Sequence, residues 1–541
     1  MTTTSTSLLA AERLLFEPVS PDPGAVQVVY AFPNTYTVGI TSLGYQMIWS
    51  LFARRTDVAV TRLFTDLQDG SLPSDAELFG FSVSWELDYV NILSLLEGHQ
   101  IPIWSHERTD SDPLIFGGGS VLTANPEPFA PFFDLILMGD GEGLIDDLVE
   151  ALQAVRGQSR QAKLRHLAQV TGIYVPNLYE VNYLSPTAGV ARISPTQEGI
   201  PAQVEKRTYR GNQLSTSTVV TAHSAWPEIY MVEVVRSCPE MCRFCLASYL
   251  TLPFRVAPVE DHLIPAVERG LQVTQRLGLL GASVTQHPHF MELLEYLAQD
   301  RFAEVRLSVS SVRAGTVTPR LAQILAERGS KSLTIAVESG SERLRQVINK
   351  KLEMPEILQA ATAAQAGGLK ALKLYGMVGI PSEQEEDVAD TLEMMRQLKQ
   401  GSPQLRYTLG CSTFVPKAQT PFQWYGVEPK AEKRLKTLAK HLRSTGVDFR
   451  PESYNWSVIQ ALISRGDRRV AQMLELARGY GDSLGSYRRA FKDLKGQLPP
   501  LDFYVHDTWD PSITLPWSHL QGSLSPERLL QHQQSAVAAM T

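Results

Sequence analysis

The sequence predicts an α/β protein with two successive strand–helix units and a mostly helical C-terminal region. Short apolar runs alternate with helical patterns up to about residue 190 and again from about 227 to 425, which indicates parallel sheets covered by helices. Cys238, Cys242 and Cys245 follow the first apolar run of the second unit. We expect a doubly wound parallel sheet at 1–190, a linker at 191–226, a partial (β/α)6 barrel at 227–425, and a helical, basic region with a tail at 426–541.

The first unit has five predicted strands, at 25–32, 58–64, 78–84, 113–116 and 133–138, with helices at 44–54, 87–96 and 144–155. Polar or glycine-rich strings follow these strands, and their candidate binding residues are Asn34, Ser82, Ser84, Gly117, Gly118, Gly139, Gly141 and Glu142. Ligands of doubly wound sheets bind at the carboxyl ends of the strands, and glycines let the backbone approach a ligand closely. Each string taken alone could equally be a simple turn.

The second unit has six predicted strands, at 229–235, 279–285, 305–311, 332–337, 371–377 and 407–414, all with polar residues at their C-terminal ends. A barrel enzyme keeps its site at that end of its strands. The cysteine loop follows the first strand, so the sequence places the three thiols at the mouth of the barrel. Beyond the barrel, helices are expected at 428–443 and 458–478.

The three cysteines form a CxxxCxxC pattern with no fourth cysteine nearby. Thiolates hold iron–sulfur clusters, usually four to a cluster, so three suggest a cluster with one open iron. A zinc knuckle, a disulfide pair and scattered core thiols are the alternatives, although His223 and His262 do not stand at zinc-ligand spacing. The remote Cys411 is a buried small hydrophobe, a thiol on the substrate side or a radical-quenching donor.

The CxxxCxxC pattern, with Phe244 before its last cysteine, resembles the signature of the radical SAM superfamily. The resemblance implies a [4Fe–4S] cluster on the three cysteines, which are both its metal ligands and the catalytic residues. It also implies that the open iron chelates S-adenosylmethionine (SAM), which is cleaved reductively to a 5′-deoxyadenosyl radical. An electron donor such as ferredoxin or flavodoxin would be a partner.

Further residues match the family's SAM-binding positions: Gly281 and Ser283 after the second strand, Ser310 and Arg313 after the third, Glu338 and Ser339 after the fourth, and Gly376 and Gly379 after the fifth. The resemblance implies contacts with the methionine amino group, the ribose and the adenine, and the Arg313 fork suits a carboxylate. The alternatives are a helix-cap or surface pair for Arg313 and an N-cap of a helix at 342–348 for Glu338.

The first unit resembles the B12-binding domain that is fused to many radical SAM enzymes, through its GGG (117–119), PEP (126–128) and GDGEG (139–143) strings. Cobalamin is therefore a candidate third cofactor. The family's Asp-x-His-x-x-Gly motif is absent, and His99 and His106 stand in other contexts. Cobalt would then lack a protein imidazole; a vestigial domain is the alternative. The string at 415–424 also resembles a B12-domain branch of unassigned activity.

Bulk composition excludes several classes of protein. The net charge of −7 is not that of a nucleic-acid-binding polycation, and four cysteines do not make a secreted disulfide scaffold. No apolar run reaches about eighteen residues and no signal sequence is evident, so no membrane span and a cytoplasmic location are expected. Residues 426–500 hold 15 Lys/Arg and 8 Asp/Glu, densest at Arg465, Arg468 and Arg469, which suggests an anionic partner such as RNA or, alternatively, a solvated helix face.

The function expected from these observations is a radical SAM enzyme that starts radical chemistry, with cobalamin-dependent methylation as one outcome. An RNA-modifying radical SAM enzyme with a vestigial first unit is an alternative. A non-catalytic Fe–S or corrinoid sensor is another. The tail at 501–541 is a candidate lid over the barrel mouth. The substrate is not visible in the sequence.

Overall fold

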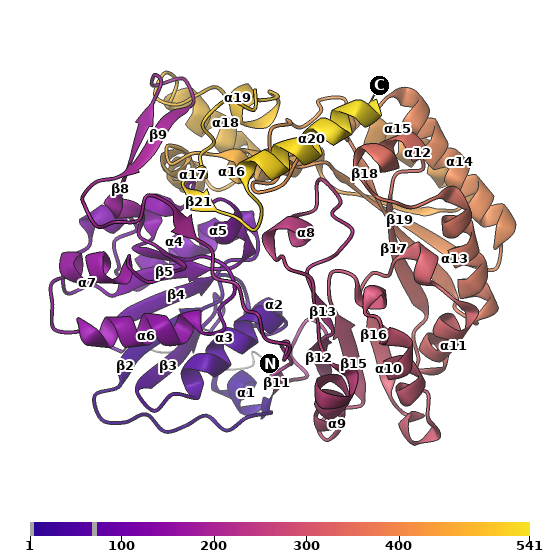
Figure 1. Cartoon of the computed structure of the whole chain (residues 1–541), viewed down its shortest axis with the longest axis horizontal. Coiled ribbons are helices and arrows are strands. Elements are labelled where there is room, and N and C mark those ends of the chain that lie inside the picture. Colours follow the sequence, from indigo (N-terminus) through magenta and orange to yellow (C-terminus); the bar gives the residue numbers. More distant parts are fainter. Residues whose placement is uncertain (1–4, 68–72, 541) are drawn as a thin grey trace.

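The computed structural model describes residues 5–67 and 73–540. Figure 1 shows three regions: an N-terminal unit in indigo and purple, a barrel unit in rose and orange, and C-terminal helices in yellow that run across the top of both. This arrangement follows the predicted fold class. No helix among the described residues is long and apolar enough to cross a membrane.

The N-terminal unit is a six-stranded sheet in the order β3-β2-β4-β5-β6-β7. Its strands are β2 (Val26–Ala31), β3 (Val58–Leu63), β4 (Leu78–Ser82), β5 (Leu114–Gly118), β6 (Leu135–Leu137) and β7 (Ile173–Tyr174). Its helices are α1 (Ser5–Ala10), α2 (Tyr36–Gly39), α3 (Leu43–Ala53), α4 (Tyr89–Gly98), α5 (Ser120–Ala124), α6 (Leu144–Ala154) and α7 (Arg160–Leu167). The first five strands of the order pair in parallel, and β7 adds an antiparallel edge that the sequence did not suggest.

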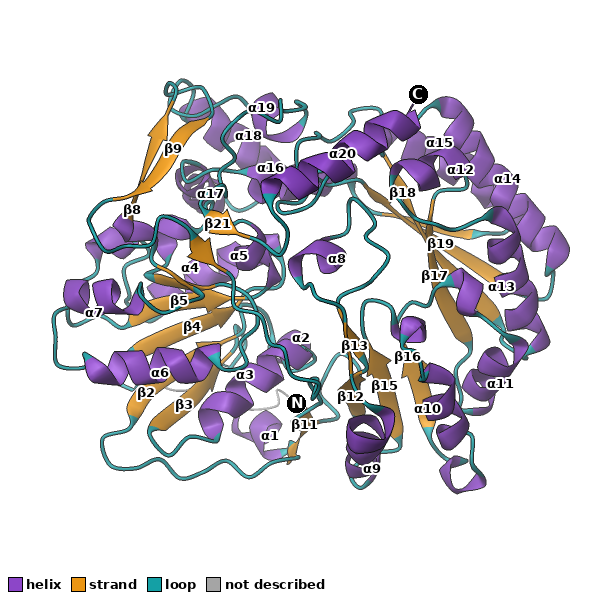
Figure 2. Ribbon diagram, viewed as in Figure 1, coloured by secondary structure: helices purple, strands orange, loops and turns teal. Residues whose placement is uncertain are grey.

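The barrel unit contains two parallel sheets, joined by a backbone bridge between Val312 and Ile335. Their strands are β12 (Ile229–Glu233), β15 (Arg276–Leu280), β16 (Arg306–Val309), β17 (Ser332–Glu338), β18 (Ala371–Val378), β19 (Arg406–Thr413) and β20 (Asp448–Pro451). Figure 2 shows the outer layer of helices: α9 (Ile264–Leu271), α10 (Phe290–Leu297), α11 (Pro319–Glu327), α12 (Glu342–Val347), α13 (Met354–Ala366), α14 (Glu385–Gly401) and α15 (Ala431–Thr445). The partial barrel is as expected, with β20 as an added strand.

Two predicted elements in these regions are wrong in detail. The strand predicted at 279–285 ends at Leu280, because Gly281 has φ +156° and the chain turns into a short helix at Val284–Gln286. The helix predicted at 458–478 is two helices, α16 (Tyr454–Arg465) and α17 (Val470–Gly479). Their break falls at Gly466, whose extended backbone ends α16.

The remaining C-terminal helices are α18 (Leu484–Asp493), α19 (Leu501–Val505) and α20 (Pro526–Met540). Helix α20 packs on α12, with Ala536 fully buried in a cluster that includes Val347 and Phe422. The tail therefore folds back over the barrel unit (Figure 1). Two pairs of short strands join distant segments: β1 (Arg13–Leu14) with β11 (Val219–Val220), and β10 (Val204–Glu205) with β21 (Leu520–Gln521). Two further pairs are local: β13 (Val235–Arg236) with β14 (Arg255–Val256), and β8 (Tyr179–Tyr183) with β9 (Val190–Pro195).

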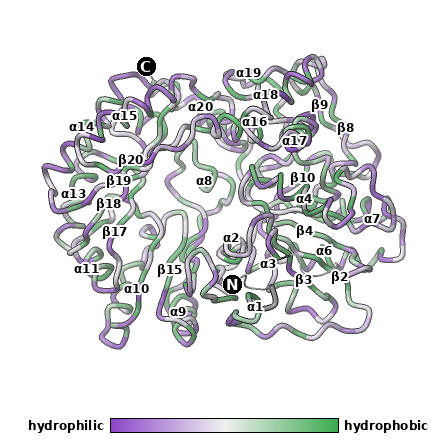
Figure 3. The backbone as a smooth tube through the Cα atoms, turned by 180° about the vertical axis from the view of Figure 1, so that it is seen from behind, coloured by the Kyte–Doolittle hydropathy of each residue, from purple (hydrophilic) through white to green (hydrophobic). Residues whose placement is uncertain are grey.

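The apolar core has two main parts. One is continuous from the N-terminal sheet into the C-terminal helices, and the other fills the space between the barrel strands and their helices. Figure 3 shows hydrophilic stretches on outward helices such as α7 and α14. The N-terminal sheet and the C-terminal helices thus form one packed body beside the barrel.

The three arginines of the basic C-terminal region are internal, which corrects the expectation of an anion-binding surface. Arg465 is 0% exposed and donates to the Tyr504 carbonyl at 2.9 Å. Arg468 pairs with Glu127 at 3.0 Å, and Arg469 pairs with its neighbour Asp467 at 2.6 Å. The solvated-face alternative is wrong for this string, because Arg465 and Arg468 hold the C-terminal helices to each other and to the N-terminal unit, whereas it fits other basic residues of the region, such as the exposed Lys433 and Lys440 of α15.

Candidate functional site

Two cavities lie at the strand ends of the molecule, and the first contains the three cysteines. The loop between β13 and α8 (Leu246–Leu250) carries Cys238, Cys242 and Cys245, which line one cavity of about 240 Å³, here named the thiol cavity. All are free thiols. Burial raises the pKa of the Cys242 thiol to about 12 and also raises the pKa of Cys238.

The arrangement of these thiols suits a cluster better than a single ion. Within residues 5–67 and 73–540, no three His, Cys, Asp or Glu side chains converge on one metal position. Three thiolates of an iron–sulfur cluster share a larger object, so they need not converge on a point. Cys411 lies apart on β19, 3% exposed, and lines neither cavity, which matches its reading as a buried small hydrophobe.

Four more of the predicted cofactor-binding residues line the thiol cavity: Phe244, Ser283, Arg313 and Glu338. They come from the loop ends of successive barrel strands, which is why a sequence reading of strand ends could find them. Ser310 and Ser339 do not line this cavity: Ser310 donates to the Gly281 carbonyl at 2.9 Å, and Ser339 accepts from a backbone amide at 3.1 Å. Gly376 and Gly379 also lie outside its lining.

Glu338 has an unusual backbone conformation at the edge of the cavity. Its φ of +64° is in the left-handed region, which non-glycine residues rarely adopt, and the register of β17 against β18 shifts at this point. Its carboxylate pairs with Lys350 at 2.9 Å. The helix that follows is capped by Ser341, whose hydroxyl accepts from the Leu344 amide, so the alternative role of Glu338 as an N-cap is wrong.

Two charged residues of this cavity were missed by the sequence reading. Lys350 lies beside Cys242, and although burial acts to lower its pKa, the Glu338 carboxylate and the nearby thiols outweigh burial and raise it. Glu240 stands inside the cysteine motif and pairs with Arg313 at 2.9 Å, while Arg313 also donates to the Lys351 carbonyl. The position of Glu240 within CxxxCxxC was a usable signal, whereas nothing local marks Lys350.

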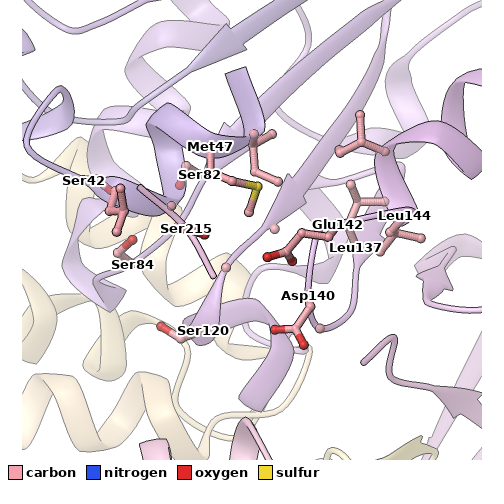
Figure 4. Close-up of a pocket in the computed structure, with 18 of the residues that line it drawn as sticks. Ser42, Met47, Ser82, Ser84, Ser120, Leu137, Asp140, Glu142, Leu144 and Ser215 are labelled. Carbon is pink, nitrogen blue, oxygen red and sulfur yellow. The ribbon is translucent and has the colours of Figure 1, made fainter. Parts of the chain in front are cut away.

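The second cavity, of about 450 Å³, lies between the N-terminal sheet and the barrel and is here named the interdomain cavity. Seven predicted residues line it: Ser82, Ser84, Gly118, Gly139, Gly141, Glu142 and, from the barrel, Gly281. Apolar side chains complete the N-terminal wall, among them Ile48 and, labelled in Figure 4, Met47 and Leu137. Asn34 and Gly117 are not part of the lining: Asn34 donates to Asp88 at 3.0 Å, and Gly117 faces Leu122.

Steric fit requires glycine at Gly139 on the rim of this cavity. It has φ +103°, and a Cβ there would lie 2.0 Å from the Arg207 carbonyl oxygen. No histidine is among the described residues that line the cavity. The glycines at these strand ends have no side chains that project into the cavity, so it has room for a large ligand.

Acidic side chains on one wall of the interdomain cavity surround Arg236. Its guanidinium lies 2.9 Å from Glu142, 3.3 Å from Asp140 and 2.7 Å from Glu233. Burial acts to lower the pKa of Arg236, but these carboxylates raise it overall. The Glu142 Oε2 atom is buried without a hydrogen-bond partner, and Figure 4 shows the carboxylates of Glu142 and Asp140 among the lining residues.

One short turn separates the two cavities. Gly281 lines the interdomain cavity, whereas Ala282 and Ser283 line the thiol cavity. A Cβ on Gly281 would lie 2.7 Å from the Val235 carbonyl oxygen, so the turn is pressed against the strand that leads into the cysteine loop. Groups bound in the two cavities would be neighbours.

Sequence comparison identifies two family models on this chain. The model described as "Radical SAM proteins, N-terminal" matches residues 44–176, and the radical SAM superfamily model matches residues 232–395. The second match begins just before the cysteine motif and covers the strand ends that line the thiol cavity. The two matches together span most of the N-terminal sheet and most of the barrel.

Individual relatives were also found. An uncharacterized protein of Methanocaldococcus jannaschii is 27% identical over 453 residues, which are 83% of this chain and 91% of that protein. A tRNA-2-methylthio-N(6)-dimethylallyladenosine synthase of Geobacillus thermodenitrificans is 24% identical over 43% of this chain and 45% of its own length. Among solved structures, the cobalamin-dependent SAM radical enzyme OxsB, with aqua-cobalamin and SAM bound, matches 95% of this chain and 79% of its own, at 13% identity and a TM-score of 0.49.

Proposed function

This chain belongs to the radical SAM superfamily, whose members are enzymes with a [4Fe–4S] cluster and SAM as cofactors, and we propose that it uses both, together with cobalamin, to methylate a small molecule. The single observation that carries the proposal is the pair of cavities on either side of the Gly281 turn. One offers three thiols, and the other offers a glycine-edged, largely apolar wall at the strand ends of a doubly wound sheet.

The residues of the thiol cavity fit a [4Fe–4S] cluster. Three free thiols open into one cavity and no fourth cysteine lines it, so one iron would stay open for SAM. When bound, the cluster supplies the electron that cleaves SAM. Because burial raises the pKa of Cys238 and Cys242, iron must displace their protons, and cluster assembly should release protons and improve with rising pH.

The charged residues around the thiols are suited to orient the amino-acid part of SAM. Arg313 presents a planar fork to the cavity and is held by Glu240 at 2.9 Å, so a ligand carboxylate would compete with or extend this pair. Glu338, held by Lys350, is an acceptor for an ammonium or ribose hydroxyl. In these roles, Arg313 would face the carboxylate of SAM, and Glu338 would face its ammonium group or ribose.

The residues of the interdomain cavity fit a corrinoid. Met47, Ile48 and Leu137 give an apolar face, while the Ser82, Ser84 and Ser120 hydroxyls and the unpartnered Glu142 oxygen can meet amide side chains of the ring. The absence of histidine from the described lining supports a cobalt without protein imidazole. We therefore favour cobalamin binding over a vestigial domain. We propose domain limits of 1–190 and 191–226 for the first unit and the linker, and we extend the barrel from 227–425 to 227–451, because α15 and β20 belong to it, which leaves 452–541 for the C-terminal region.

RNA as a substrate is less favoured, although relatives that modify tRNA exist. The match to the Geobacillus thermodenitrificans synthase spans less than half of either protein, and Arg465, Arg468 and Arg469, which suggested an anionic partner, are buried or paired with carboxylates. A non-catalytic sensor has no need for Arg313 and Glu338 beside the thiols. A small-molecule methylation enzyme, reduced by ferredoxin or flavodoxin, accounts for both cavities.

Anaerobic reconstitution tests the proposal. The full chain should take up four irons and, with dithionite and SAM, release 5′-deoxyadenosine and methionine. Added cobalamin should bind with a base-off absorption spectrum, because no histidine is among the described residues that line the interdomain cavity. Absence of SAM cleavage by iron-loaded protein would overturn the radical mechanism, and absence of cobalamin binding under reducing conditions would overturn the methylation proposal alone.

A further inference from the structure

The inner face of the barrel strands is built differently from an ordinary barrel interior. Along β17, β18 and β19 the outward residues are apolar and buried against the helices: Leu333, Ile335, Leu372, Leu374, Tyr407 and Leu409. The alternate residues, which point inward, are Thr334, Ala336, Lys373, Tyr375, Thr408 and Gly410. Barrel interiors are usually filled by bulky branched side chains. This one has small and polar residues instead, and it stays open enough to leave Tyr375 52% exposed.

Lys373 and Tyr375 stand on the same strand, β18, in adjacent inward rows, and Arg406 of β19 occupies the next row beyond Lys373. Lys373 is flanked on the neighbouring strands by Thr334 and Thr408. Tyr375 is flanked by Ala336 and Gly410. A Cβ on Gly410 would approach the Tyr375 ring at 3.5 Å, so glycine at this position leaves the ring uncovered.

Lys373 is exposed, and its ammonium group forms no ion pair within the described part of the chain, whereas Lys350, nearer the thiols, is paired with Glu338 at 2.9 Å. The Asp448 carboxylate, which contacts the Thr408 hydroxyl on the side away from Lys373, forms an ion pair with Arg450 at 2.6 Å. A lysine between two threonine hydroxyls therefore offers a positive charge and two hydrogen-bonding groups to a ligand.

The inner face is continuous with the thiol cavity. Ala336 and Glu338 line that cavity, and Ala336 belongs to the same row as Tyr375. Successive inward residues of a strand are about 7 Å apart. Each set of cross-strand partners on this face forms one row. Going from the thiols into the barrel, the rows are marked by the charged Glu338, then the aromatic Tyr375, then the cationic Lys373.

We propose that this inner face binds the substrate, and that the substrate is a planar-ring compound bearing an anionic group, either a carboxylate or a phosphate. The ring would stack on Tyr375, and the anion would reach Lys373 and the two threonines about 7 Å further in. The rest of the ligand would then extend toward the thiol cavity. This inference deepens the proposed function and rests on it, since it names the substrate class of the same site.

Direct binding of fluorescent probes tests the site without turnover. The probes are 1-naphthylacetate, 1-naphthyl phosphate and the uncharged 1-naphthaleneethanol, followed by fluorescence anisotropy with iron-loaded full-length protein. We expect at least one anionic probe to bind about tenfold more tightly than the alcohol, as one charge-assisted contact supplies. A tighter acetate indicates a carboxylate substrate, and a tighter phosphate indicates a phosphorylated one.

Variants assign the binding to the two residues. Lys373→Met should weaken the favoured anion about tenfold and leave the alcohol unchanged, and Lys373→Arg should restore the anion. Tyr375→Leu should weaken all three probes by a similar factor. Lys440→Met, on the outer helix α15 where Lys440 is also exposed, is the matched control and should change nothing.

Equal affinity for the three probes, or an anion preference that survives in Lys373→Met, would overturn the inference. SAM cleavage by wild-type protein is measured on the same preparation. Probe binding with no 5′-deoxyadenosine would sink the proposed radical function and leave the anion site standing. SAM cleavage without a Lys373-dependent anion preference would overturn the anion site and leave the proposed radical function standing.

Discussion

The thiol cavity and the interdomain cavity lie on either side of one turn and differ in almost every property. The thiol cavity is smaller, belongs to the barrel alone, and brings Arg313, Glu338 and Lys350 next to three thiols. The interdomain cavity is larger, has walls from two units, and combines apolar side chains with glycine edges. The difference indicates two separate roles. The thiol cavity offers metal ligands and charged side chains, and the interdomain cavity offers space for a large ligand.

The two cavities should also respond differently to disturbance. The thiol cavity is held by contacts within the barrel, such as the Asn349 side chain, which donates to the Met241 carbonyl at 2.9 Å. The interdomain cavity depends on contacts between units, such as the ion pair of Arg255 with Asp140 at 2.8 Å. Substitutions can therefore be chosen that affect one cavity and spare the other.

The largest effect is expected from Cys242→Ala. Removing one of only three thiols from the thiol cavity should abolish both iron–sulfur loading and release of 5′-deoxyadenosine, as seen by iron analysis and product chromatography. Cys411→Ala is the matched control: it should keep its iron and lose only about 1 kcal/mol of unfolding free energy from the buried site. Persistent SAM cleavage in Cys242→Ala would contradict the assignment of the cavity.

The next largest effect is expected from Gly118→Val, which should block the interdomain cavity and weaken cobalamin binding. A Cβ at Gly118 would lie 3.7 Å from Leu137, an ordinary contact, so the strand can accept the residue while its methyl groups fill the cavity. Cobalamin affinity should fall about hundredfold, whereas iron content should not change. Gly157→Val, at an exposed glycine with no neighbour within 4 Å, is the control. Undiminished cobalamin binding would show that the ligand sits elsewhere.

The sequence predicted the fold wherever strands are long and buried on both faces. All five residues of β4 are buried, so an apolar run marks the strand clearly. The short edge strand β7 and the added β20 have only two and four residues, too few for a pattern. The break between α16 and α17 was overlooked because the helical pattern continues through it, although Gly466 followed by Asp467 is a recognisable helix stop and start.

The site was predictable where the motif is local. Eight residues carry all three thiols, and the resemblance to the radical SAM superfamily marked Ser283, Arg313 and Glu338 at the strand ends that line the same cavity. Long-range partners were not predictable. The charge count around Arg468 suggested an open basic patch, but its partner Glu127 lies 341 residues earlier in the chain.

Acid should weaken, by a smaller amount, the packing of the tail on the N-terminal unit. His519 is 3% exposed between the N-terminal sheet and the tail, and burial lowers its pKa to about 4. The folded protein therefore binds fewer protons than the unfolded chain, whose histidine titrates near 6.5, so stability is lost as pH falls below 6.5. Between pH 7.5 and 5 the unfolding free energy should fall by about 2 kcal/mol from this group.

Urea unfolding across that pH range measures the effect, and His519→Leu should remove this part of the pH dependence. Its imidazole nitrogens have no hydrogen-bond partner in the described structure, so the substitution leaves no new polar group unpaired. A pH profile of His519→Leu that is as steep as that of the wild type would assign the acid sensitivity to other groups, Glu127 first, at 3.5 Å from the ring.

The smallest effect is expected at the edge of the thiol cavity, from Glu338→Gln. The amide keeps the shape of the side chain and a hydrogen bond to Lys350, but it removes the negative charge that faces the ligand. SAM affinity, measured by equilibrium dialysis with iron-loaded protein, should fall about tenfold, which is the worth of one charge-assisted hydrogen bond. Glu342→Gln, on the exposed start of α12, is the control and should bind SAM like the wild type. Equal SAM affinity in the two variants would mean that Glu338 serves only to hold Lys350, and the charge division between the two cavities would then rest on Arg313 and the thiols.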